Sequence, residues 1–338
     1  ELMADYIGIK GVHIPIVSSD PSNLTAGEIW YNTTSNTLKA YGAQGTGAWS
    51  SGTATPTAMF GGNAAGTNTA ALTWGGYFPP ASPSLYRDLT FEWDGSSWTS
   101  GGAYPIGFQR GFGFGTQTAA LGAGGYGPAA YQDVSNTYDG STWTSGPTMN
   151  TARGYSSVGF GPTTAAVAVN GNDPGGRTSY VEEFNGTSWT EVTNTPAVGS
   201  GGGGAGTTTA GLSFLGSDTP GAGGRVATSN AYDGTSWTAT NACNSSRTGV
   251  GASGATQANA MAYGGGPGPA PYSTYTEQFD GTSWTEVADL STQRQAIYAP
   301  LGGGTQLASM AIMGDTGVGN TIVEEWAVPD ATKTVTSS

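Results

Sequence analysis

The feature that most constrains the fold is a seven-residue segment, Tyr138 to Thr144, that returns along the chain in nearly the same wording. It reads Tyr-Asp-Gly-Ser-Thr-Trp-Thr, and its copies place a tryptophan at residues 98, 143, 189, 237 and 284. The copies are therefore 45, 46, 48 and 47 residues apart. Self-similarity at such a period is typical of repeat proteins, in which each repeat is one supersecondary unit. The period constrains the fold but not, by itself, the function.

Four short strands, here lettered A to D, can be predicted in each repeat. In the repeat at 151–196 they cover 155–160, 165–169, 178–184 and 188–192. Gly, Asn and Asp between them supply turns, and no segment shows a sustained helical period. One such sheet cannot bury both of its faces alone, whereas sheets packed face to face around a ring can. We therefore predict an all-β fold, a β-propeller of four-stranded antiparallel blades.

The aromatic residues of strand C set the expected number of blades. They occur seven times, at Tyr41, Trp93, Tyr138, Phe184, Tyr232, Phe279 and Trp326. We expect seven blades, with six as the alternative if the N-terminal segment pairs differently. Residues 1–52, an N-terminal strand plus a β-meander, would form the first blade, and residues 53–338 would complete one propeller. The last blade would take its fourth strand from Lys333 to Thr336. Tryptophans would anchor the blades at Trp49, Trp98, Trp143, Trp189, Trp237, Trp284 and Trp326.

Charge and composition exclude several classes of function. Acidic residues number 23 against 10 basic ones, which gives a net charge of −13, and no basic cluster is present. Nucleic-acid binding requires Lys and Arg to neutralise phosphates, so we expect no nucleic-acid partner. No apolar stretch approaches the roughly 18 residues that span a bilayer, so we expect no membrane insertion. The single cysteine, Cys243, rules out an intrachain disulfide and a thiolate cluster, and we expect no metal and no cofactor.

The scarcity of histidine removes most catalytic schemes. His13 is the only histidine, and no Gly-x-Ser-x-Gly segment accompanies it, so a Ser-His-Asp triad has little support. The repeated Asp-Gly turns differ from the Asp-box of sialidases, because Asp139 precedes Trp143 by only four residues. Asp and Gly at these positions are explained by hairpin turn geometry. We expect no enzymatic activity, and a structural or surface role for His13.

The order of residues within each repeat resembles the kelch repeat, which also forms β-propellers. That repeat has an arginine before strand A, a glycine pair after strand B, and then an aromatic residue and a tryptophan at fixed offsets. The arginine is interpreted here as Arg110, Arg153, Arg247 and Arg294. The glycine pair stands at Gly75-Gly76, Gly124-Gly125 and Gly264-Gly265. The resemblance covers about residues 53–328 and concerns architecture more than activity.

The amino-acid sequence of the N-terminal segment and of the repeats resembles that of kelch-like structural proteins of marine bacteriophages, cyanophages especially. The resemblance rests on Ser19 to Asn23, Gly27 to Thr34, Leu38-Lys39, the run at 116–121 and the ending Thr332 to Thr336. It implies a tail- or fibre-associated protein of the virion, with other virion proteins as partners. Met3 reads as a natural start without a cleavable signal, which is consistent with synthesis in the host cytoplasm.

The loops between strands B and C differ most from repeat to repeat. The A–B and C–D loops are short and nearly uniform, whereas the B–C loops vary in length and contain aromatic and acidic residues. In an antiparallel blade the B–C and D–A loops emerge on the same face. Aromatic rings beside Asp and Asn are what sugar recognition uses. The competing interpretation is that these loops vary because nothing constrains them. The candidate binding residues are Tyr77, Phe78, Tyr126, Asp173, Asp218, Tyr272 and Asp315.

Three hypotheses for the function follow. The first is a non-enzymatic virion module that binds a host-surface glycan or protein through the B–C loop face. The second is a purely structural virion protein that docks other virion subunits. The third is a glycan-processing enzyme, which would need a cluster of carboxylates near the ring axis.

Overall fold

The computed structural model describes residues 14–78, 85–155, 158–219, 224–268, 271–297 and 304–335, and His13 lies outside them. The described residues form strands and turns without an α-helix. Accordingly, no helix in the described part of the chain is long and apolar enough to cross a membrane. The chain divides into two compact units, one of residues 1–47 with 328–338 and one of residues 48–327. The boundary thus lies at 47/48 rather than at 52/53.

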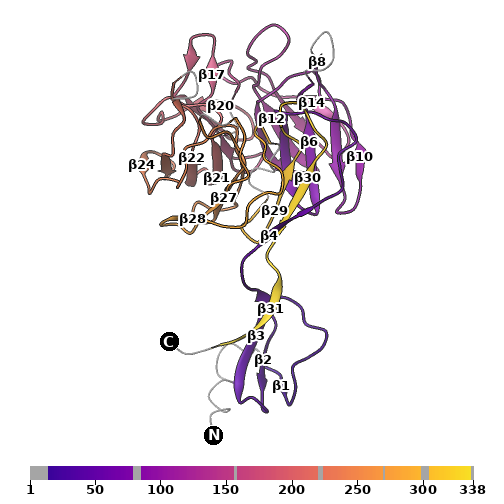
Figure 1. The fold of residues 1–338 in the computed structure, drawn as a ribbon. Coiled ribbons are helices and arrows are strands. Elements are labelled where there is room, and N and C mark those ends of the chain that lie inside the picture. Colours follow the sequence, from indigo (N-terminus) through magenta and orange to yellow (C-terminus); the bar gives the residue numbers. More distant parts are fainter. Residues whose placement is uncertain are drawn as a thin grey trace. The chain divides into compact units, whose positions relative to one another are not determined.

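The larger unit contains five sheets of four strands each, and the strands of a sheet pair side by side in their chain order (Figure 1). Blade 1 consists of β5 (Asn63–Thr67), β6 (Ala70–Trp74), β9 (Thr90–Trp93) and β10 (Trp98–Ser100). Blade 2 consists of β11 (Phe112–Thr116), β12 (Ala119–Ala123), β13 (Ser135–Tyr138) and β14 (Trp143–Ser145). Blade 3 consists of β15 (Gly159–Phe160), β16 (Ala166–Val169), β19 (Val181–Phe184) and β20 (Trp189–Glu191).

The next two blades repeat this order. Blade 4 consists of β21 (Gly203–Thr207), β22 (Ala210–Phe214), β23 (Ser229–Tyr232) and β24 (Trp237–Ala239). Blade 5 consists of β25 (Gly251–Ser253), β26 (Ala260–Tyr263), β27 (Thr276–Phe279) and β28 (Trp284–Glu286). Two short hairpins stand in B–C loops: β7 (Tyr77–Phe78) with β8 (Leu85–Tyr86), and β17 (Asn172–Asp173) with β18 (Gly176–Arg177). All neighbouring strands within these sheets are antiparallel, as predicted.

Blade 6 is assembled from both ends of the larger unit. Its described strands are β29 (Ala308–Ile312), β30 (Val323–Ala327) and β4 (Ala48–Ser51), in that order. Strand β4 therefore supplies the outermost strand of the last blade, with Trp49 opposite Trp326. Residues 298–303 lie outside the described residues. The expectation that Lys333 to Thr336 completes this blade is wrong, because Lys333 and Thr334 pair with Ala40 and Lys39 instead.

The six sheets are arranged in a ring. Their inner strands contact one another in the order β5, β11, β15, β21 and β25, and β29 contacts β5 again. The predicted all-β propeller with four-stranded antiparallel blades is confirmed. Six blade sheets are found among the described residues of this unit, which is the alternative count. A further four-stranded sheet exists, but it belongs to the other compact unit, so Tyr41 does not mark a blade of the ring.

The repeated tryptophans connect the blades. Each strand D tryptophan packs against the strand C aromatic residue of its own blade. The ring centroids are 4.9 Å apart for Tyr138–Trp143 and 5.0 Å for Phe184–Trp189. The Trp143 indole donates a hydrogen bond to Thr90 Oγ1 of the previous blade at 3.0 Å. The predicted anchors Trp49, Trp98, Trp143, Trp189, Trp237 and Trp284 all occupy strand D. Trp326 differs, because it is the strand C partner of Trp49.

The repeated Asp is a turn residue. Asp139 Oδ1 accepts the backbone N–H groups of Ser141 at 2.9 Å and Thr142 at 2.8 Å. The backbone hydrogen bond from Thr142 makes the largest contribution to holding the pKa of Asp139 at about 2. Asn185 makes the same two bonds in blade 3. The repeated segment is therefore a turn followed by an anchoring tryptophan.

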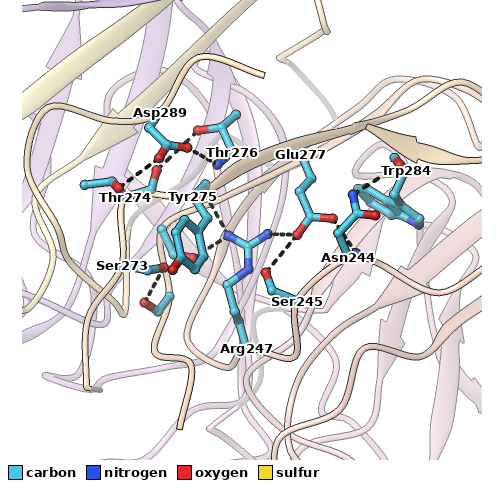
Figure 2. A network of polar contacts seen from close by, with 12 residues as sticks. Asn244, Ser245, Arg247, Ser273, Thr274, Tyr275, Thr276, Glu277, Trp284 and Asp289 are labelled. Carbon is cyan, nitrogen blue, oxygen red and sulfur yellow. Dashed lines mark hydrogen bonds and ion pairs between the residues drawn. The ribbon is translucent and has the colours of Figure 1, made fainter. Parts of the chain in front are cut away.

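Three blades contain a buried ion pair between the segment before strand A and strand C. The pairs are Arg153–Glu182, Arg247–Glu277 and Arg294–Glu324, with side chains at most 1% exposed. In blade 5 Arg247 donates to Glu277 Oε1 at 2.6 Å and to the Tyr275 carbonyl at 2.7 Å (Figure 2). Glu277 Oε2 accepts the backbone N–H of Asn244 at 2.7 Å. Both charges are thus paired and hydrogen-bonded, which a buried ion pair requires.

The ion pair occurs only where that backbone N–H is available. The N–H groups of Asn150, Asn244 and Ser291 each lie 2.7 Å from the glutamate of their own blade. Blades 1, 2 and 4 have proline at this position, and proline has no N–H. These blades also lack both charges. Their residues at the proline, arginine and glutamate positions are Pro56, Met59 and Phe91; Pro105, Phe108 and Asn136; and Pro196, Gly199 and Asn230.

The smaller unit is a separate four-stranded sheet. Its order is β1 (Ile16–Val17), β2 (Ile29–Asn32), β3 (Thr37–Ala43) and β31 (Asp330–Thr334), and only β1 and β2 are parallel. The Asp20 carboxylate accepts hydrogen bonds from Lys39 Nζ at 2.7 Å, Asn32 Nδ2 at 2.7 Å and Trp30 Nε1 at 3.0 Å. These bonds, with that from Lys39 the largest, lower the pKa of Asp20 to about 2.

Replacing Arg247 with Met should lower the free energy of unfolding by about 3–5 kcal/mol, because Glu277 would stay buried without a counter-charge. The double variant Arg247→Met/Glu277→Gln removes both charges at nearly constant volume and should be less destabilised than the single variant. Chemical unfolding monitored by tryptophan fluorescence measures both. A double variant at least as unstable as Arg247→Met would contradict this account.

Acid should destabilise the smaller unit through Asp20. A carboxyl group whose folded pKa lies below its ordinary value of 3.8 contributes stability above that value, and this contribution is lost as the pH falls towards about 2. Amide hydrogen exchange of residues 29–41 measured from pH 5 to pH 2 tests this. Asp20→Asn is the control, and its exchange should depend less on pH. Equal pH dependence in the two proteins would refute the role of Asp20.

Candidate functional site

Six left-handed residues, one from each blade, form a ring at the propeller axis, on the face that carries the B–C and D–A loops. They are Gly61 (φ 67°), Arg110 (54°), Tyr155 (55°), Gly201 (67°), Gly249 (68°) and Ala296 (49°). Their backbone groups bond from blade to blade: Gly201 N–H donates to Tyr155 O at 3.0 Å, and Gly249 N–H donates to Gly201 O at 2.6 Å. Ala296 N–H donates to Gly249 O at 2.7 Å, and Gly61 N–H to Ala296 O at 3.1 Å. We call these six residues the axial ring.

The axial ring has one open link. Arg110 N–H donates to Gly61 O, but the link between Tyr155 N–H and Arg110 O is not hydrogen-bonded. Glycine adopts a left-handed conformation without steric cost, whereas other residues are strained there by about 1–3 kcal/mol. Two of the strained residues, Arg110 and Tyr155, flank the open link. Backbone strain is therefore concentrated at this part of the axis.

The assignment of Arg110 to the kelch arginine position requires correction. Arg153 O accepts the N–H of Gly125, and in blade 2 the equivalent acceptor for Gly76 is Phe108 O. Phe108 therefore occupies the position of Arg153, and Arg110 stands two residues later, in the axial ring. Phe108, Arg153, Arg247 and Arg294 each stand ten residues after the strand D tryptophan, whereas Arg110 stands twelve after it, so counting from the tryptophans shows the shift.

The mouth of the axis is narrow. Arg110, Tyr155, Ala296, Ile297 and the glycines of the axial ring and Gly62 line a depression there. The space at its centre is about that of a single water molecule. A whole sugar ring or a peptide side chain does not fit into it. A larger ligand would have to rest on the loops around the mouth and send only a small group into it.

Aromatic side chains cover the loop face of blades 1 to 3. They contact one another in sequence, with centroid distances of 5.5 Å for Phe60–Tyr77, 5.4 Å for Tyr77–Tyr86, 6.0 Å for Tyr86–Tyr126 and 5.6 Å for Tyr126–Tyr155. Tyr131 packs against Tyr126 at 5.1 Å. All six rings are half-buried. We call Phe60, Tyr77, Tyr86, Tyr126, Tyr131 and Tyr155 the aromatic crescent.

Three tyrosines of the crescent, Tyr86, Tyr131 and Tyr155, are neutral at physiological pH. Burial is the main cause that raises the pKa of Tyr86, Tyr131 and Tyr155 above the ordinary value. The Tyr155 hydroxyl accepts a hydrogen bond from Gln109 Nε2 at 3.4 Å. The crescent thus presents ring faces together with hydroxyl groups, the combination that stacks on a sugar and hydrogen-bonds to it.

The loops of blades 4 to 6 present smaller and more polar groups on the same face. Isolated β-bridges join the D–A and B–C loops there between Ser200 and Ser217, between Thr248 and Gly266, and between Gln295 and Asp315. Equivalent bridges in blades 1 and 2 join Phe60 to Tyr77 and Gln109 to Tyr126. The D–A and B–C loops therefore lie together in every one of these blades, as predicted. Among the residues that the structure describes, the contacting aromatic rings of this face are concentrated in blades 1 to 3.

The candidate binding residues separate into three groups. Tyr77 and Tyr126 belong to the aromatic crescent, and Phe78 lies beside it under the guanidinium of Arg87, 5.8 Å from its ring centroid. Tyr272 donates to Asp315 Oδ1 at 3.4 Å on the polar half. Asp173 and Asp218 form hydrogen bonds within their own loops. The Asp173 carboxylate accepts the N–H of Gly175 at 2.7 Å, and the Asp218 backbone N–H donates to Gly224 O at 2.8 Å.

Sequence reasoning missed Tyr86, Tyr131, Tyr155 and Arg110 as parts of this face. Tyr86 and Tyr131 lie in the variable B–C loops of blades 1 and 2, so the loop criterion already included their segments. Tyr155 and Arg110 lie in D–A segments, which share the face but were interpreted as strand and as repeat signature. Comparing the repeats position by position would have shown Arg, Tyr and Ala where three repeats have Gly.

The described residues contain no group of three or more His, Cys, Asp or Glu side chains that could hold a metal ion. Three buried carboxylates, Glu182, Glu277 and Glu324, are engaged by arginines. Cys243 is buried, and burial raises the pKa of its thiol far above the ordinary value.

No family model and no curated protein matches the chain. Among solved structures it is similar to YjhT, with a TM-score of 0.66 and 15% identity over 84% of this chain and 100% of that chain. At this identity the likeness shows the fold alone. The chain is a β-propeller-like protein.

Proposed function

We propose that this propeller is a non-enzymatic recognition module of a virus particle, associated with a tail or fibre, and that it binds a host-surface glycan or protein. The observation that carries the proposal is the aromatic crescent. Six rings from blades 1 to 3 are contiguous, half-buried and packed against one another. A stable monomer has no need to keep so many aromatic rings at its surface.

The crescent suits a saccharide better than a flat protein surface. Its rings carry hydroxyl groups, so apolar stacking and directional hydrogen bonds are available side by side. The narrow mouth of the axis directs an extended ligand onto the surface rather than into a deep cleft. The assignment to a virion rests on the resemblance of the repeats and of the N-terminal segment to phage structural proteins. It implies assembly in a host cytoplasm and display on the particle.

A second candidate function is purely structural: docking of other virion subunits. The division of the chain into two compact units favours it, because the smaller unit can attach to a particle independently of the propeller. A protein that is incorporated stoichiometrically into particles, but whose isolated full chain binds no cell and no glycan, would support this function over recognition. Both roles are compatible if the two units divide them.

Replacing Tyr77 or Tyr126 with Ala should weaken binding about tenfold for each ring, as expected of an aromatic contact at the centre of an interface. Glycan arrays and host-cell binding with the full chain measure the effect. Tyr275→Ala is the matched control, because Tyr275 is 40% exposed but lies outside the crescent. Binding by Tyr77→Ala/Tyr126→Ala equal to that of the control would remove the crescent from the proposed function.

A further inference from the structure

We propose that the axial mouth binds an anionic substituent of the ligand, with Arg110 as its counter-charge, so that the crescent takes acidic saccharides in preference to neutral ones. The inference rests on the proposed function and makes its ligand class specific. The chemistry required is a carboxylate or sulfate group attached to a sugar ring. The ring would stack on Tyr126 and Tyr155 while the anionic group lies at the rim of the mouth, beside Arg110.

Arg110 is an arginine without a counter-ion. Arg153, Arg247 and Arg294 each form an ion pair with a glutamate, whereas no described carboxylate lies within ion-pair distance of Arg110. The Arg110 guanidinium lies over the Tyr155 ring, 5.2 Å from its centroid, and its buried Nε, like those of Arg247 and Arg294, has no hydrogen-bond partner among the described residues. A guanidinium remains charged in proteins, so leaving it desolvated and unpaired is costly unless a ligand completes it.

The fold does not require arginine at this position. Gly61, Gly201 and Gly249 occupy it in three blades and Ala296 in a fourth, and each of these residues donates the ring hydrogen bond. Arginine pays a conformational penalty that glycine would avoid. Gly61 leaves room for it, because a Cβ at Gly61 would lie 3.1 Å from Arg110 Cγ. Arg110 thus combines a strained backbone with a charged side chain that the hydrogen bonds of the axial ring do not use. This combination is expected of a functional residue.

The open link of the axial ring adds a second donor beside the guanidinium. Tyr155 N–H has no hydrogen-bond partner among the described residues, and it belongs to the residue on which Arg110 lies. Backbone N–H groups and an arginine together are a common way to hold an oxyanion. The nearest opposing charge is Asp315, which is held by Tyr272 at 3.4 Å and by Gln295 Nε2 at 3.4 Å.

Arg110→Gly is the decisive variant, because it removes the guanidinium and relieves the backbone strain at the same time. It should unfold at the same temperature as the wild type or higher, and it should lose the preference for acidic ligands, about tenfold in affinity. Asn36→Gly is the matched control, because Asn36 is also left-handed (φ 55°), lies outside the axial ring and carries no charge. It should keep the preference.

The probes are glucuronate, glucose 6-sulfate and glucose, titrated against the full chain by ligand-observed NMR, with acidic and neutral oligosaccharides on an array. Tighter binding of both anionic sugars, weakened by salt, is the expected result, and a preference for one of them identifies the carboxylate or the sulfate. Equal binding of glucose and the anionic sugars by the wild type overturns the inference. So does a preference that persists in Arg110→Gly. If Tyr126→Ala still abolishes binding in that case, the crescent and the proposed function stand without the anion site.

Discussion

The pairing of β4 with β30 is the constraint on which the propeller depends. Without β4, the last blade would end at Trp326 with an open edge and the ring would be held only by contacts between sheets. Open sheet edges are templates for pairing with other chains. Because β4 comes from the start of the larger unit, the first segment made is also the one that closes the ring. Trp49 then does for blade 6 what Trp143 does for blade 2, including an indole hydrogen bond to the previous blade.

Within this closed ring the blades are built in two ways. In the first kind of blade, a backbone N–H before strand A donates to a buried glutamate, and an arginine neutralises that glutamate. Asn244, Glu277 and Arg247 are an example. Where proline removes the N–H, both charges are absent. The reason is physical: a buried carboxylate without donors, or a buried guanidinium without an acceptor, destabilises the fold by several kcal/mol. Arg110 departs from this rule, since it is charged, partly buried and unpaired, and that departure separates it from the structural arginines.

The repeat period predicted the architecture because every copy places a turn and a tryptophan in the same geometry. It did not predict how the ring closes, since Tyr41 and Trp49 resemble a repeat although they lie in different units. Pairing between segments far apart in the sequence leaves no local signal. For the candidate site, loop variability selected Tyr77 and Tyr126, which the structure places in the aromatic crescent. It passed over Arg110 and Tyr155, because they lie in D–A segments. A comparison of the repeats shows them where other repeats have Gly, but their left-handed backbone and the missing ion pair are seen only in the structure.

In the smaller unit, β3 and β31 pair with each other, for example at Ala43 and Asp330. In the amino-acid sequence, the whole propeller comes between these two strands. During synthesis β3 emerges early and its partner emerges only after all six blades. Until then, β3 presents an unpaired edge that can capture another chain. The sheet of the smaller unit can therefore be completed only after the ribosome has translated the entire propeller. A chain truncated anywhere in the blades would lack a finished sheet at its N-terminal end, and assembly that depends on this sheet would select against incomplete copies.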